Sequence, residues 1–328
     1  MLRLPRFKYL RPKSAREAAD MARELGAKAM FVAGGTDLFP KLKRRQFEVE
    51  ALIGLDFLDS RIEEGFVGAG ATLAAVSGDP RLPAGYAEAA GLVSSPPLRN
   101  AGTAGGNLCV DTRCNYYDMP YEWRKAIGYC LKKDGDICLV APSSPRCWAV
   151  SSSDTAPMAI TLGATVMLAG PDGEREAPVE SLYRDDGIDY LAKQPYEVVT
   201  AVRLPASSRT LSAYVKLRRR GSIDFPIAGA AVAIELDGDV VESCRIALSA
   251  VASYPLEARA AGEFLAGKRL DEESIKAAAE LAAKPAKPLD NADLTHFWRK
   301  RMVRVVVEQA LFRATRNGPS AVKLAGAV

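Results

Sequence analysis

Ala33-Gly34-Gly35-Thr36-Asp37-Leu38 is the stretch that decides how this chain folds. It follows a predicted buried strand over residues 29–32 and precedes a predicted short helix over residues 38–44. Two glycines between a strand and a helix let backbone N–H groups approach an anion closely. The helix N-terminus and the Thr36 hydroxyl favour the same ligand. The motif therefore predicts a phosphate-binding loop, while a tight turn with a capping Thr or Asp is the plain alternative.

The sequence on both sides of this loop predicts a βαβ unit over residues 1–57. Residues 8–10 form a short strand, and Ser14-x-x-Glu17 matches a capping box at the start of a helix. Small and apolar residues then repeat at helical spacing as far as Gly26, and residues 51–55 form a further strand. The Gly-rich loop therefore lies inside this unit, directly after its second strand.

A second Gly-rich stretch is Asn100-Ala101-Gly102-Thr103-Ala104-Gly105-Gly106-Asn107. Such a segment can press its backbone against a flat or phosphorylated ligand. Because a dinucleotide presents two phosphates and a long body, the two stretches together favour a dinucleotide site. Gly68-x-Gly70 is not a nucleotide fingerprint, since Leu73 stands where the third glycine is needed. The sequence also has no P-loop motif.

The cysteines are strongly clustered. Only Cys244 lies outside residues 108–150, a segment rich in Tyr and Trp that looks like an inserted module. There is no Cys-x-x-Cys pair, and the single histidine, His296, is far away. Four thiolates without histidine suit an iron–sulfur cluster or an all-cysteine zinc site, whereas buried small hydrophobes are the plain alternative. The clustered residues are Cys109, Cys114, Cys130, Cys138 and Cys147.

The rest of the chain predicts an α+β region. Pro171-Asp172-Gly173 and Asp237-Gly238-Asp239 are hairpin turns. Helices are expected over residues 256–265, 272–283 and 294–315, and the tail after Gly318 is expected to be loose.

Composition excludes several function classes. The 328 residues carry a net charge of only +4, which demands neither a nucleic-acid nor a membrane partner. Neither a spanning apolar run nor a signal peptide is found, so a cytoplasmic protein with reduced thiols is expected. The basic runs Lys41–Arg45 and Arg218–Arg220 are expected to be solvated. With His296 at a helix start, there is no Ser/His/Asp or Cys/His set, which points to cofactor chemistry.

These motifs, in this order, resemble the FAD-binding medium subunit of the molybdenum hydroxylase family, which includes xanthine dehydrogenase and carbon monoxide dehydrogenase. Residues 33–38 look like its first flavin motif, and Thr103-Ala104-Gly105-Gly106-Asn107-Leu108 looks like its second. Ser153-Asp154-Thr155-Ala156-Pro157, with residues 162–164 behind it, resembles the segment that follows. Lys216 to Arg220, then Asp224 and Ala228, resemble the entry to the C-terminal domain.

The resemblance implies an α+β fold in three parts. A two-lobed FAD-binding domain, of the vanillyl-alcohol oxidase (PCMH-like) type, has a βαβ lobe at residues 1–57 and a larger α+β lobe at 58–205, with the insert at about 108–150. A C-terminal α+β domain covers residues 206–328. By this resemblance, Gly34, Gly35 and Thr36 would hold the pyrophosphate of FAD together with Thr103. Gly106, Asn107 and Asp154 would contact its middle and ring end, and Lys216 would approach the ring. The first motif adds Ala33, Asp37 and Leu38 to the cofactor-binding residues.

The insert is the main departure from the family pattern. Most members have only a short link between the second motif and the Asp154 segment. The insert resembles that of the β subunit of 4-hydroxybenzoyl-CoA reductase, which holds an additional [4Fe–4S] cluster. The resemblance implies Cys114, Cys130, Cys138 and Cys147 as ligands, with Cys109 as the spare.

The resemblance further implies an electron-transfer oxidoreductase subunit without a substrate site of its own. Electrons would pass from ferredoxin to [4Fe–4S], to FAD, to two [2Fe–2S] clusters on a small subunit, and to the molybdenum cofactor on a large subunit, in an (αβγ)2 complex that reduces an aromatic thioester. An oxidising molybdenum hydroxylase, of the aldehyde, xanthine or CO dehydrogenase kind, is one alternative. A zinc-stabilised scaffold protein that binds an acidic partner is another.

Overall fold

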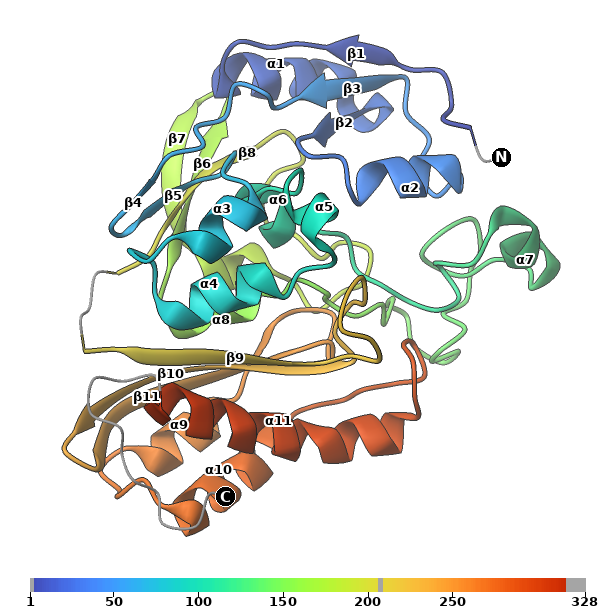
Figure 1. Cartoon of the computed structure of the whole chain (residues 1–328). Helices are drawn as coiled ribbons and strands as arrows, with labels where there is room; N and C mark the ends of the chain where they lie inside the picture. The colour runs from blue at the N-terminus through green and yellow to red at the C-terminus, as the bar shows by residue number, and fades with distance from the viewer. Residues whose placement is uncertain (1–2, 206–208, 317–328) are drawn as a thin grey trace.

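The computed structural model describes residues 3–205 and 209–316, and its N-terminal part is a small parallel sheet (Figure 1). Its elements are β1 (Lys8–Leu10), α1 (Ala15–Leu25), the 3₁₀ turn η1 (Gly26–Lys28), β2 (Ala29–Val32), α2 (Leu38–Lys43) and β3 (Ala51–Gly54). The strands lie in the order β1-β3-β2. The predicted βαβ arrangement is therefore present, and the Gly-rich loop joins β2 to α2.

Helix α1 begins at the predicted cap. The Ser14 Oγ accepts the Glu17 backbone N–H at 3.2 Å. The Glu17 carboxylate accepts the N–H of Lys13, at 2.7 Å, in place of the N–H of Ser14 that a capping box requires. Only the Ser14 half of the predicted box is therefore formed.

A five-stranded antiparallel sheet follows, in the order β4-β5-β8-β6-β7. Its strands are β4 (Ile62–Glu63), β5 (Phe66–Gly68), β6 (Thr165–Gly170), β7 (Gly173–Pro178) and β8 (Val198–Arg203), and η2 (Val179–Leu182) is a 3₁₀ turn. Helix α1 lies against this sheet as well as its own, since Ala18, Ile53 and Val198 share one core. The predicted Pro171-Asp172-Gly173 turn joins β6 to β7.

Short helices fill the space between this sheet and the C-terminal part (Figure 1). They are α3 (Leu73–Gly78), α4 (Ala84–Gly91), α5 (Pro96–Arg99), α6 (Ala104–Leu108) and α8 (Thr155–Thr161). All seven residues of α8 are buried, and it contacts α4 and α6 on one side and β10 (Ala228–Asp237) on the other. Asp154 thus enters the centre of the molecule at the start of α8.

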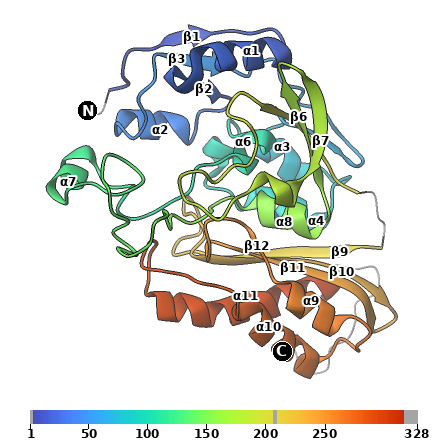
Figure 2. The ribbon, with the colours of Figure 1, turned by 180° about the vertical axis from the view of Figure 1, so that it is seen from behind.

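The C-terminal part is a four-stranded antiparallel sheet covered by helices on its outer face (Figure 2). Its elements are β9 (Leu211–Leu217), β10, β11 (Val240–Ser249), β12 (Leu256–Glu257), α9 (Arg259–Leu265), α10 (Glu272–Ala283) and α11 (His296–Arg316). The predicted Asp237-Gly238-Asp239 hairpin joins β10 to β11. The prediction of one helix over residues 256–265 is wrong at its start, because residues 256–257 pair with β11 as a strand.

The insert has little regular structure. Its one helix of four residues or more is α7 (Tyr121–Ala126), which stands away from the body near α2 in both views (Figures 1 and 2). Hydrogen bonds tie it to the N-terminal part: Gln46 Nε2 donates to the Tyr117 carbonyl at 2.7 Å, and the insert's own Arg124 donates to the Arg44 carbonyl at 2.8 Å. Asn291 Nδ2 reaches the Trp148 carbonyl from the C-terminal part. The module is therefore anchored at several points.

Over residues 3–205 and 209–316, the helices lack the combination of length and apolarity that crossing a membrane requires. The predicted boundary at residue 206 and the predicted loose tail after Gly318 lie outside the described residues.

Candidate functional site

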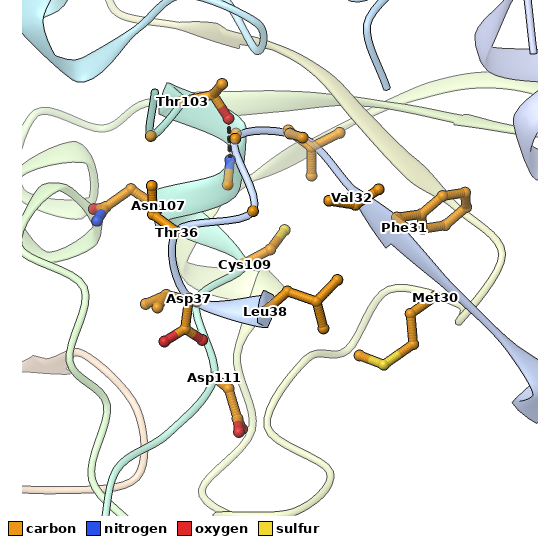
Figure 3. Close-up of a pocket in the computed structure, with 18 of the residues that line it drawn as sticks. Met30, Phe31, Val32, Thr36, Asp37, Leu38, Thr103, Asn107, Cys109 and Asp111 are labelled. Carbon is orange, nitrogen blue, oxygen red and sulfur yellow. Dashed lines mark hydrogen bonds between the residues drawn. The ribbon is translucent and has the colours of Figure 1, made fainter. Parts of the chain in front are cut away.

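A cavity of about 870 Å³ lies where the two N-terminal sheets and the β9–β10 connection meet, and Figure 3 shows part of its lining. Its size is within the range of cofactor and ligand sites, about 300–1,000 Å³. Every residue predicted to approach FAD lines it, although these residues come from four separate segments of the chain. They are Ala33, Gly34, Gly35, Thr36, Asp37, Leu38, Thr103, Gly106, Asn107, Asp154 and Lys216.

The two Gly-rich stretches lie against each other in one wall of the cavity. A Cβ added at Gly34 would stand 1.9 Å from the Ala101 carbonyl oxygen, so the backbones touch with no room for a side chain. Gly35 has φ +67°, and its Cβ would meet the Phe39 ring at 2.3 Å. Both glycines are thus required for the shape of the loop, and this shape leaves backbone groups facing the cavity.

Thr103 and Asn107 are fixed by the short helix α6 (Figure 3). The Thr103 Oγ1 accepts the Gly106 N–H at 3.1 Å and caps the helix. The Asn107 Oδ1 accepts three bonds, from the Ser153 hydroxyl and from the N–H and hydroxyl of Thr155, at 2.9, 3.2 and 2.7 Å. Its amide N–H groups donate to no described residue, so they remain available as donors at the cavity wall.

Asp154 and Lys216 form a buried ion pair at the cavity, with 2.7 Å between Oδ2 and Nζ. Tyr214 donates its hydroxyl to Asp154 Oδ1 at 2.8 Å, and Ser249 lies 3.1 Å from the same hydroxyl. Burial raises the pKa of Asp154, while the bonds from Lys216 and Tyr214 oppose that rise. The C-terminal sheet therefore holds the carboxyl group in one orientation. Sequence reasoning missed Tyr214 and Ser249, because they lie in ordinary strand patterns.

The expectation that the Lys41–Arg45 run is solvated is wrong for Lys41. Its side chain is fully buried, pairs with Asp37 at 3.6 Å and contacts Asp111. Asp111 also pairs with Lys132, at 2.8 Å. We call this series, Asp37–Lys41–Asp111–Lys132, the buried ion chain. Its four-residue spacing from Asp37 to Lys41 was the one signal in the sequence that could have indicated it.

The ammonium groups of Lys41 and Lys132 stabilise the buried carboxylate of Asp111 in its charged form. Burial raises the pKa of Asp111, but the two ammonium groups outweigh it and the pKa lies below its usual value of 3.8. The carboxylate of Asp111 and that of Asp37 both line the cavity (Figure 3). The buried ion chain thus begins at the first Gly-rich loop and passes along the cavity wall.

We expect Asp111→Ala to lower the free energy of unfolding by about 3–5 kcal/mol, because it leaves two buried ammonium groups without their shared partner. Urea titration followed by circular dichroism measures this. Asp172→Ala is the control, since Asp172 is 88% exposed and its pair with Arg23, at 3.7 Å, is worth about 0–1 kcal/mol. Because the folded pKa of Asp111 is depressed, the difference should be present at neutral pH and shrink as pH falls below 3.8. Equal losses in both variants would contradict this account.

The four cysteines that the family resemblance singled out lie around a second, small cavity of about 10 Å³. All four side chains are buried, and Lys132, Tyr116 and Tyr117 share the lining. The Cys147 sulfur accepts the Ala149 N–H at 3.4 Å. Burial raises the pKa of Cys114 to about 12 and that of Cys147 to about 11. At neutral pH, Cys114 and Cys147 are therefore neutral thiols unless a metal replaces their protons. The four are Cys114, Cys130, Cys138 and Cys147.

The other two cysteines are elsewhere. Cys109 lines the large cavity, and Cys244 lies on β11. Within the described ranges, no three His, Cys, Asp or Glu side chains are arranged to hold one metal ion. A single zinc binds four sulfurs at about 2.3 Å each, which requires them to crowd one point. A multi-iron cluster takes one sulfur at each iron and needs only that four thiols surround a common space.

The large cavity, lined by residues of both Gly-rich stretches, has the size and lining that suit an extended dinucleotide. Residues 5–207 match the family described as "FAD binding domain in molybdopterin dehydrogenase", and residues 212–314 match "CO dehydrogenase flavoprotein C-terminal domain". The chain therefore belongs to the FAD-binding subunit family of the molybdenum hydroxylases. It is an FAD-binding oxidoreductase subunit.

Relatives of known identity agree with this. The chain is 30% identical to the carbon monoxide dehydrogenase medium chain of Afipia carboxidovorans, over 94% of this chain and 96% of that one. It is 31% identical to the FAD-binding subunit of an Escherichia coli aldehyde oxidoreductase, over 78% and 84%. The solved carbon monoxide dehydrogenase of Hydrogenophaga pseudoflava superposes with a TM-score of 0.77 at 28% identity, covering 95% of this chain and 98% of that one. These matches confirm the predicted α+β fold class with its two-lobed FAD domain.

Proposed function

We propose that this chain relays electrons through FAD within a larger complex, in an (αβγ)2 assembly. Its FAD would exchange electrons with two [2Fe–2S] clusters on a small subunit and, through them, with a molybdenum cofactor on a large subunit. One observation carries this: residues from four distant segments, each part of a motif, surround one cavity of about 870 Å³. The relatives named as medium chains support the partner subunits.

Each group of residues would have its own role toward FAD. The loop of Gly34, Gly35 and Thr36 would donate backbone N–H groups to the pyrophosphate, helped by the Thr103 hydroxyl. The unpaired side-chain N–H groups of Asn107 and the Asp154–Lys216 ion pair would orient the middle and the ring end of FAD. FAD, when bound, supplies the capacity to exchange one or two electrons. The substrate would bind on the large subunit.

We further propose that the insert holds one [4Fe–4S] cluster. Four buried cysteines around one cavity, in a segment anchored at both ends, form the donor set that such a cluster requires. The cavity of about 10 Å³ has room for about one water, so the sulfurs would move apart when a cluster binds. Membership of the flavoprotein family leaves no support for the zinc-stabilised scaffold.

The direction of electron flow separates two versions of this function. The two relatives described above are subunits of a carbon monoxide dehydrogenase and an aldehyde oxidoreductase, which favours a complex that oxidises its substrate and passes electrons outward through FAD. The cysteine cavity favours the second version, a 4-hydroxybenzoyl-CoA reductase-like complex that takes electrons from ferredoxin. A cluster on this chain would serve either version as a port for one-electron carriers.

The test uses the complex purified anaerobically through a tag on this chain. We expect large and small partner subunits to co-purify, acid treatment to release FAD, and iron and sulfide to exceed what the partners account for. Recovery of FMN alone, or of this chain without partners, would contradict the proposal. Flavin bleaching by carbon monoxide or an aldehyde supports the oxidising version, and bleaching by reduced ferredoxin alone supports the reductive one. Rapid bleaching by NADH at the turnover rate would argue against a one-electron carrier as the natural partner.

A further inference from the structure

Lys132 is the residue that joins the two cavities. Its side chain is 6% exposed and lines the small cavity together with the four cysteines. Its ammonium group pairs with Asp111, which lines the large cavity, at 2.8 Å. It lies 5.6 Å from the ring of Tyr190, a second residue of the large cavity. A positive charge therefore lies between the cysteines and the proposed flavin site.

The ammonium group is held in this place by several acceptors. Besides the Asp111 carboxylate, it donates to the Thr112 hydroxyl at 2.7 Å and to the Gly187 carbonyl. The Thr112 hydroxyl and the Gly187 carbonyl also bind each other. Gly187 touches the cysteine side as well, because a Cβ there would stand 2.6 Å from the Cys147 sulfur. The charge is thus fixed by a network that extends to one of the proposed ligands.

Two other lysines show that this placement is specific. Lys41 pairs with the same carboxylate and is fully buried, but it lines neither cavity. Lys133 is the next residue on the same turn, yet it pairs with Asp134 at 2.9 Å and with Glu48 at 3.5 Å, outside both linings. Of these three lysines, only Lys132 lines the cysteine cavity.

We propose that Lys132 is a positioning residue that raises the reduction potential of the iron–sulfur cluster by holding a fixed positive charge between the cluster and the flavin. This inference rests on the proposed [4Fe–4S] site. Reduction adds one electron to the cluster, drawn from FAD or from an external one-electron carrier, with no bond formed or broken and no proton taken up. Four thiolates make the cluster anionic, so the added electron increases its negative charge. Lys132 stabilises that reduced form, and the stabilisation is strong because the site is buried.

The experiment compares Lys132→Met, Lys133→Met and Lys41→Met in the assembled complex. Iron and sulfide content, and the cluster signal in electron paramagnetic resonance during a potential titration, are measured. We expect Lys132→Met to make the cluster about tenfold harder to reduce, a shift of about 59 mV to lower potential. Lys133→Met and Lys41→Met should shift the potential by less than half as much. Lys132→Arg should restore most of the wild-type value, because it keeps the charge.

A second variant removes a negative charge instead of a positive one, and it separates the effect of charge from damage to the fold. Asp111→Asn removes the negative partner and keeps Lys132, so it should move the potential upward, which loss of packing would not do. If Lys132→Met assembles poorly, this variant decides: an upward shift supports the inference and an unchanged potential overturns it. Equal downward shifts in all three lysine variants, or none in Lys132→Met, also overturn it while leaving the cluster in place. A wild-type complex without iron on this chain would instead overturn the proposed site, and the inference with it.

Discussion

Cys130→Ser should abolish the iron–sulfur cluster, with the iron and sulfide attributable to this chain falling to background. Each iron of such a cluster needs a thiolate, and a serine hydroxyl is a harder and poorer ligand. Cys130 lines the small cavity and not the large one, so most of the FAD should remain. Metal analysis, sulfide determination and electron paramagnetic resonance of the reduced complex measure the loss. The same result is expected for Cys114→Ser, Cys138→Ser and Cys147→Ser.

Two controls distinguish the four cysteines from the others. Cys244→Ala should keep its iron, because Cys244 lies on β11 away from the small cavity. Cys109→Ala should also keep its iron, since Cys109 lines the large cavity. Full iron retention in Cys130→Ser would show that the ligand assignment is wrong. Zinc in place of iron after anaerobic purification would show that the proposed iron–sulfur cluster is wrong.

Gly35→Val should remove most of the FAD while the chain still folds. Gly35 has φ +67°, and a side chain there meets the Phe39 ring at 2.3 Å. A β-branched residue in that conformation costs about 1–3 kcal/mol. The loop can relieve the strain only by leaving its present shape, which corresponds to about a 5- to 150-fold weaker site. The ratio of flavin absorbance to protein after gel filtration measures the loss.

Gly78→Val is the matched control for that variant. Gly78 lies at the end of α3, outside the lining of the large cavity, and a Cβ there has nothing within 4 Å. It should therefore bind FAD as the wild type does. Unchanged flavin content in Gly35→Val, or an equal loss in Gly78→Val, would contradict the role given to the first Gly-rich loop.

Local features of the fold could be predicted because they depend on neighbouring residues. Ser14 at the start of α1, the two hairpin turns and the Gly-rich loop after β2 appear where the sequence indicates them. Their signals are cap, turn and periodicity patterns that act over a few residues. The prediction of a helix over residues 256–265 is wrong at its start, because residues 256–257 pair with β11 as a strand. No local pattern indicates that contact.

The residues expected to approach FAD, and the four cysteines expected as ligands, came from the resemblance of ordered motifs to a family. Spacing alone could not choose four of the five clustered cysteines. The structure separates them, since four line the small cavity and Cys109 lines the large one. Their roles toward FAD and a cluster remain predictions that the variants above test.

By itself, the sequence indicated a βαβ unit over residues 1–57, two Gly-rich loops and an insert that holds five of the six cysteines. Only the tertiary structure decided which charges meet. Lys41 and Asp111 are 70 residues apart, and Lys216 and Asp154 are 62 apart. A lysine in a basic run has the same local sequence whether it is solvated or buried, and the cost of burying it is repaid only when a distant carboxylate reaches it. That pairing depends on how the sheets and the insert close on one another, which no short pattern encodes.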